Sequence, residues 1–169
     1  TISLSGTSIS KNGKTLAYGI SKAGSDWVEI HFKDVESKND LPDVLKWVKF
    51  SGMSWKGNGI YYSRYDEPTA SALSQKNQFH KLYFHELGTE QEKDILIYED
   101  RNNPDFNFSG NVTDDENYLA IYTSQSTSGQ RLMIKNLNNP YARFVNIANN
   151  FDFENSIVEN IGKTFYLRT

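Results

Sequence analysis

The sequence predicts an all-β fold, a partial β-propeller of about three and a half four-stranded antiparallel blades. A polar turn followed by a short apolar strand recurs at residues 10–18, 54–62, 113–121 and 159–167. When Gly13, Gly57, Glu116 and Gly162 are taken as equivalent points, successive repeats lie 44, 59 and 46 residues apart. Repeats of about 40 to 50 residues with several strands each are typical of propeller blades rather than helical solenoids.

The first predicted blade comprises residues 1–50. After its first hairpin, residues 26–35 alternate, with Val28, Ile30 and Phe32 on one side and polar residues on the other, as in a half-buried strand. The run VLKWVKF at 44–50 is expected to be the outermost strand of this blade.

The remaining repeats predict a blade at 51–100, a blade at 108–148 and the first half of a further blade at 156–169. The longer second interval comes largely from a polar, small-residue loop insertion at 66–78, which is expected to be mobile. Such a loop is either a tolerated insertion or part of a substrate entrance, and the sequence leaves both readings open.

Composition excludes several classes of protein. Aromatic residues make up 14% of the chain and hydrophobic residues 37%, which argues against disorder, and a mean hydropathy of -0.63 leaves no candidate membrane span. A net charge of -3 with mixed signs gives no footprint for nucleic acid. Without cysteine there is no disulfide, thiolate nucleophile or Cys-based zinc site, and localisation stays open between cytoplasm and periplasm.

No catalytic residue, cofactor or metal site is expected in this chain. A serine nucleophile of the α/β-hydrolase type needs a G-x-S-x-G turn between strand and helix, and the sequence contains none. His80 and His85 are five residues apart and would point to opposite faces of a strand, so they and His31 are expected to be surface or inter-blade residues. The acidic triplet at 114–116 lacks the spacing of a calcium loop and fits a turn.

Three long runs carry a family resemblance: GSDWVEIHFKDV, LPDVLKWVKFSGMSW and HKLYFHELGTEQEKDILIYED. They closely resemble the non-catalytic β-propeller of prolyl oligopeptidases, serine peptidases that cleave short peptides after proline. The resemblance implies a seven-bladed propeller that caps an α/β-hydrolase catalytic domain of the same parent chain. It also implies that this segment gates and shields the active site and meets short proline-containing peptides.

The resemblance further implies roles for four residues. Phe50 would supply an apolar contact in the third substrate subsite, although the residues alone favour a core position for it. Asp26 would pair with an arginine of the catalytic domain, or else serve only as a turn residue before Trp27. Asn107 and Ser126 occupy places where some relatives have apolar or sulfur-containing cavity residues, and they are weaker candidates.

One alternative function stays open, a propeller that displays its loops to a macromolecular partner and is not attached to a peptidase. A related oligopeptidase with basic specificity is a narrower alternative. Both ends of the sequence look cut, because an apolar run stops at Thr169 without a partner strand. An unclosed ring would expose unpaired strand edges, so the isolated segment is expected to self-associate.

Overall fold

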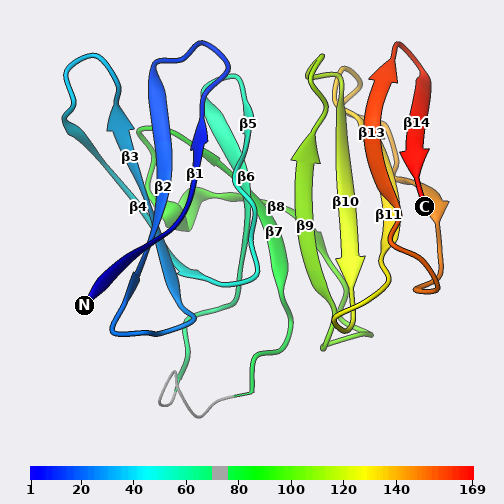
Figure 1. The fold of residues 1–169 in the computed structure, drawn as a ribbon, viewed down its shortest axis with the longest axis horizontal. Coiled ribbons are helices and arrows are strands. Elements are labelled where there is room, and N and C mark those ends of the chain that lie inside the picture. Colours follow the sequence, from blue (N-terminus) through cyan, green and yellow to red (C-terminus); the bar gives the residue numbers. More distant parts are fainter. Residues whose placement is uncertain (70–75) are drawn as a thin grey trace.

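A computed structural model describes residues 1–69 and 76–169 as antiparallel sheets that stand side by side along the chain (Figure 1). The only helix within these ranges is the short 3-10 turn η1 (Gln91–Lys93). The expected all-β antiparallel fold is therefore confirmed. None of the described residues forms a helix that is long and apolar enough to cross a membrane.

The first sheet holds the strands β1 (Ile2–Ile9), β2 (Thr15–Lys22), β3 (Val28–Asp34) and β4 (Asp40–Val48), paired in that order. The strand expected at 44–50 begins earlier, at Asp40, and ends at Val48. Pro42 lies within it and lacks a donor N–H. β4 tolerates this proline because it is the outer strand, which pairs along its length only with β3.

The later strands repeat this layout. The second sheet contains β5 (Ser54–Lys56), β6 (Gly59–Arg64), β7 (Lys81–Glu86) and β8 (Ile95–Glu99), and the third contains β9 (Asn107–Val112), β10 (Tyr118–Ser124), β11 (Arg131–Asn136) and β12 (Val145–Ala148). The strands β13 (Ser156–Ile161) and β14 (Thr164–Arg168) form a separate hairpin. A single residue pair, Val48 with Arg64, joins the ladders of the first two sheets. The strands β1 to β8 thus form one continuous eight-stranded sheet, and the first and second sheets are its two halves.

The four turn positions that the repeats align share one backbone conformation. Gly13, Gly57 and Gly162 have φ values of 72°, 56° and 58°, and Glu116 has a φ of 57°. Glycine adopts this left-handed region without steric cost, which accounts for its presence in three of the four turns. Glu116 makes compensating contacts with the preceding hairpin, because its Oε1 accepts a hydrogen bond from the Gly57 N–H at 3.2 Å.

The core lies between sheets rather than within one of them. One cluster joins the first and second sheets and consists of Ala17, Ile30, Phe32, Leu45, Val48, Trp55, Ile60, Tyr62 and Tyr83. A second cluster joins the second and third sheets and consists of Tyr61, Leu82, Phe106, Phe108, Leu119, Ile121 and Met133. Alternate residues of β6 enter different clusters, as the pleat requires, so this strand is buried on both faces.

The two ends of the row expose apolar side chains. On β1, Ile2 and Leu4 are 69% and 66% exposed, and on β13, Val158 and Ile161 are 68% and 64% exposed. The insertion predicted at 66–78 falls partly outside the described residues, because residues 70–75 are not among them. Beyond that gap, Lys76 and Gln78 contact the carboxylate of Asp105 at 3.0 and 2.9 Å.

A candidate binding site at one end of the sheets

Chain direction places all four predicted site residues at the same end of the sheets, the lower end in Figure 1. Asp26 lies in the loop from β2 to β3, and Phe50 follows β4 directly. Asn107 is the first residue of β9, and Ser126 lies in the loop from β10 to β11. Even-numbered strands end here and odd-numbered strands begin here, so residues far apart in sequence share this surface.

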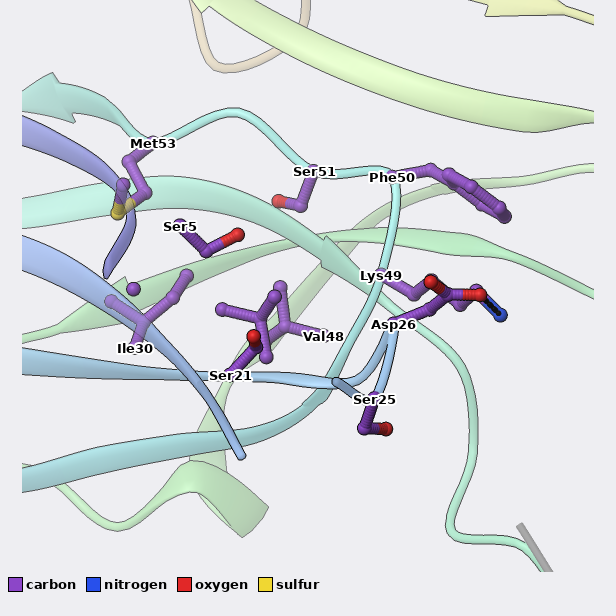
Figure 2. A pocket seen from close by; sticks show the side chains of 12 residues that line it. Ser5, Ser21, Ser25, Asp26, Ile30, Val48, Lys49, Phe50, Ser51 and Met53 are labelled. Carbon is purple, nitrogen blue, oxygen red and sulfur yellow. Dashed lines mark ion pairs between the residues drawn. The ribbon is translucent and has the colours of Figure 1, made fainter. Parts of the chain in front are cut away.

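A cavity of about 420 Å³ at this end contains two of the four residues, Asp26 and Phe50 (Figure 2). Its apolar lining comes from Val28, Ile30, Val48 and Met53, and its polar lining includes Ser5, Ser21, Ser25 and Ser51. These residues come from β1 to β4 and from the segment that leads to β5. The cavity therefore lies between the first sheet and the segment that connects it to the second.

Phe50 is not a core residue, because its side chain is 60% exposed. Its backbone has a φ of 52°, in the left-handed region that a residue with a Cβ enters at a cost of about 1–2 kcal/mol. An exposed aromatic ring in a strained conformation needs support from its surroundings. This arrangement can offer a large apolar contact surface with little flexibility to a ligand.

Lys49 is a member of this site that the sequence analysis missed. Its Nζ lies 3.4 Å from Asp26 Oδ2, and 5.4 and 5.2 Å from the ring centres of Trp27 and Phe50. In Figure 2 the side chains of Asp26, Lys49 and Phe50 extend to the same side of the segment that follows β4. A lysine between two aromatic rings makes cation–π contacts and covers them with its aliphatic stem.

Asp26 is free to meet a second cation. Its side chain is 79% exposed, so the pair with Lys49 contributes at most about 1 kcal/mol. The turn role that the sequence left open for Asp26 is taken by its neighbour, because Ser25 Oγ accepts the hydrogen bond of the Trp27 N–H at 3.1 Å. The Asp26 carboxylate therefore remains available at the surface.

His80 is buried and contacts the backbone of the segment that carries Phe50. Its Nδ1 accepts a hydrogen bond from the Phe108 N–H at 2.9 Å, so the proton of the neutral ring is on Nε2, which donates to the Lys49 carbonyl at 2.8 Å. Burial lowers the pKa of His80 to about 4. The imidazole therefore has one defined tautomer, and its two hydrogen bonds join the ends of the first, second and third sheets.

Tyr65 connects His80 to Asn107. The Tyr65 and His80 rings lie 4.6 Å apart, and Tyr65 Oη donates a hydrogen bond to Asn107 Oδ1 at 2.5 Å. Burial, aided by the charge of Asp105, raises the pKa of Tyr65 to about 12, so its hydroxyl remains a donor at neutral pH. Asn107 does not line the cavity of Phe50, but this chain of contacts links the two residues.

Ser126 is not brought to this cavity. Its exposed Oγ donates to the Ser128 carbonyl at 3.3 Å, within the same loop. The structure thus gathers Asp26 and Phe50 around one cavity, connects Asn107 to it indirectly and leaves Ser126 apart.

A second buried polar group joins the first two sheets away from this cavity. His85 lies 3.1 Å from Asp43 and 2.7 Å from Asp94, and Asp94 also accepts a hydrogen bond from Tyr62 Oη at 2.6 Å. Burial alone would lower the pKa of His85, but the two carboxylates outweigh it and raise that pKa. Across residues 1–69 and 76–169, no group of three or more His, Asp or Glu side chains is arranged to hold a metal ion.

Comparisons with known proteins agree on one family. All 169 residues match the family model described as the prolyl oligopeptidase N-terminal β-propeller domain. A prolyl endopeptidase of Elizabethkingia meningoseptica is 42% identical over 100% of this chain and 24% of its own length. Prolyl oligopeptidase A of Galerina marginata is 38% identical over 100% of this chain and 26% of its own length. The chain therefore spans about a quarter of the curated relatives that it matches.

Solved structures give the same result. A structure from a study of two prolyl endopeptidases and the role of inter-domain dynamics in their catalysis and specificity is similar over 98% of this chain and 24% of that chain. Its sequence identity is 27% and its TM-score is 0.88. Prolyl oligopeptidase B of Galerina marginata in its apo form is 25% identical, with a TM-score of 0.85 over 98% of this chain and 25% of that chain. The propeller architecture that the repeats predict is thereby confirmed.

Proposed function

Because this chain belongs to the prolyl oligopeptidase family and matches its N-terminal β-propeller domain, we propose that it is part of a serine peptidase that hydrolyses short peptides after proline. The catalytic serine, aspartate and histidine come from an α/β-hydrolase domain of the same parent chain. The match to relatives about four times as long, with names that specify prolyl endopeptidases, supports this proposal.

In the proposed peptidase, the lower end of the sheets faces the substrate. The single observation that carries this role is the exposed ring of Phe50 beside the Asp26 carboxylate at one cavity. Phe50 supplies an apolar wall for the third subsite, the position two residues before the proline. Asp26 pairs with an arginine of the catalytic domain, because a carboxylate that is largely exposed can hold a guanidinium through two hydrogen bonds.

The propeller also shields the active site. A cap over the catalytic centre admits flexible peptides, excludes folded proteins and removes water, which strengthens the electrostatic interactions of the reacting groups. Asn107 and Ser126 lie at the same end of the sheets and are weaker candidates for the outer subsites. In this role the chain binds and selects substrate, and the partner domain performs the chemistry.

The test uses the full-length protein that contains these residues. We expect the purified protein to cleave acetyl-Phe-Gly-Pro-4-nitroanilide after proline and to leave the same peptide with alanine in place of proline largely intact. A Phe50→Ala variant should lower kcat/KM for this peptide about tenfold or more, because an apolar subsite contact is lost. The peptide acetyl-Gly-Gly-Pro-4-nitroanilide has no side chain for that subsite and should be affected much less.

Asp26→Asn provides the second measurement. This variant keeps the size of the side chain and removes its charge, so it should weaken the interdomain ion pair and lower kcat/KM for both peptides alike. A wild-type protein that cleaves neither peptide would contradict the peptidase assignment and favour the alternative, a propeller that binds a macromolecular partner. Unchanged kinetics in Phe50→Ala would contradict only the subsite role.

A further inference from the structure

We propose that His80 is a positioning residue for the third subsite, which holds the Phe50 ring in place through a hydrogen bond to the preceding peptide group. This inference rests on the proposed function of Phe50. His80 is 1% exposed and cannot touch a peptide in the cavity. It acts through the backbone of Lys49, whose carbonyl accepts its Nε2–H at 2.8 Å.

The geometry of the peptide bond explains why this contact orients Phe50. The carbonyl of Lys49 and the nitrogen of Phe50 belong to one planar group, so a directional hydrogen bond to the oxygen restrains the orientation of the whole plane. The φ angle of Phe50 measures the rotation between that plane and the rest of the residue. At 52° this angle is in the left-handed region, where a residue with a Cβ is strained and would relax if it were not held.

The other ring nitrogen anchors His80 itself. Nδ1 accepts the Phe108 N–H at 2.9 Å, and Phe108 is a buried residue of β9 in the third sheet. Because Nδ1 is an acceptor, the ring has one tautomer available, with the proton directed at Lys49. His80 therefore connects β9 through two hydrogen bonds to the segment between β4 and β5, which is not part of a strand.

The same ring couples Phe50 to Asn107. Tyr65 lies against His80 with ring centres 4.6 Å apart, and its hydroxyl donates to Asn107 Oδ1 at 2.5 Å. The Tyr65 N–H also donates to the Trp47 carbonyl at 3.1 Å, two residues before Lys49. The orientation of Phe50 is thus set by contacts with two neighbouring sheets, and His80 is the residue common to them.

Two substitutions separate the functions of the two ring nitrogens in the full-length protein. His80→Gln keeps an N–H donor near the place of Nε2, and His80→Asn keeps an acceptor near the place of Nδ1 but loses the donor to Lys49. The measurement is the ratio of kcat/KM for acetyl-Phe-Gly-Pro-4-nitroanilide to that for acetyl-Gly-Gly-Pro-4-nitroanilide. We expect His80→Asn to lower this ratio about fivefold, mainly through KM, and His80→Gln to preserve it within about twofold.

Phe50→Ala is the matched control and distinguishes the two proposals. If Phe50→Ala leaves the ratio unchanged, the subsite role of Phe50 is wrong, whatever the His80 variants do. Suppose that Phe50→Ala lowers the ratio, whereas the two His80 variants retain it or lower kcat/KM for the two peptides equally. His80 is then only structural, and the positioning role is overturned. Should His80→Asn fail to fold, a His80→Gln variant with a lowered ratio would also overturn it, because the donor to Lys49 is preserved.

Discussion

Acidification should destabilise the propeller through His80, because its neutral form is built into the fold. The unfolded chain takes up a proton at this residue below its ordinary pKa of 6.5, whereas the folded protein resists protonation until a pH of about 4. The stability that His80 contributes is therefore complete above pH 6.5 and is lost as the pH falls toward 4. The physical cause is burial, together with a Phe108 N–H that occupies the site where the second proton would bind.

The difference between the folded and unfolded pKa values of His80 determines how much unfolding free energy is lost on acidification. Complete loss corresponds to about 3 kcal/mol of unfolding free energy, and about 2 kcal/mol is lost between pH 7.5 and pH 5. The neighbouring Tyr65 does not titrate in this range, since its pKa is raised to about 12. A His80→Gln variant removes the titrating group, so the pH dependence of its stability should be smaller by about 2 kcal/mol over the same interval.

The assay is urea unfolding of the 169-residue chain at micromolar concentration, followed by tryptophan fluorescence. Trp27, Trp47 and Trp55 all belong to the first two sheets or their connections and report on the surroundings of His80. All other titrating groups are common to the wild type and the variant, so their contributions cancel in the comparison. Equal losses of stability in the two proteins between pH 7.5 and pH 5 would refute the reasoning.

Two further predictions concern the joints between sheets, and a third concerns the exposed ends of the row. Asp94→Asn removes a buried carboxylate that contacts His85 and Tyr62, and it should lower the unfolding free energy by about 3 kcal/mol in urea titrations; a loss below about 1 kcal/mol would contradict the ion pair. Gly110→Ala places a Cβ 2.9 Å from Leu82 Cδ1 and should cost about 1–3 kcal/mol, but much less in a Leu82→Ala background, so additive effects would argue against that contact. The isolated chain should associate through its exposed ends as its concentration rises, and a single monomeric species in light scattering at high concentration would oppose this expectation.

Repetition and periodicity made most of the fold predictable. The alternation around Ile30 and the recurring glycine turns locate strands from local sequence alone. The beginning of β4 was not predictable, because Asp40 and Pro42 are typical of loops and are accommodated only at an outer strand. Local patterns contain no information on which strand lies at the edge of its sheet.

The site was predictable only where a resemblance supplied it. Phe50 and Asp26 were predicted because the runs around them resemble a known family, and the structure places both at one cavity. Lys49 and His80 were missed as site residues, because their roles depend on partners distant in sequence. His80 is 31 residues from Lys49 and 28 from Phe108, and a histidine that precedes an apolar strand is as often exposed as buried.

The junction between the first two sheets has a consequence for how such a molecule can change over evolutionary time. Only Val48 and Arg64 pair in a ladder across it. The remaining cohesion comes from apolar side chains such as Phe32 and Tyr62, whose attraction has no fixed direction, and from a few polar contacts such as that between His85 and Asp43. A unit can therefore be duplicated, lost or exchanged at the expense of one ladder pair and a few side-chain contacts. Duplication or deletion within the gene can lengthen or shorten the row by whole units, provided that the sheets that become neighbours present apolar faces of matching shape.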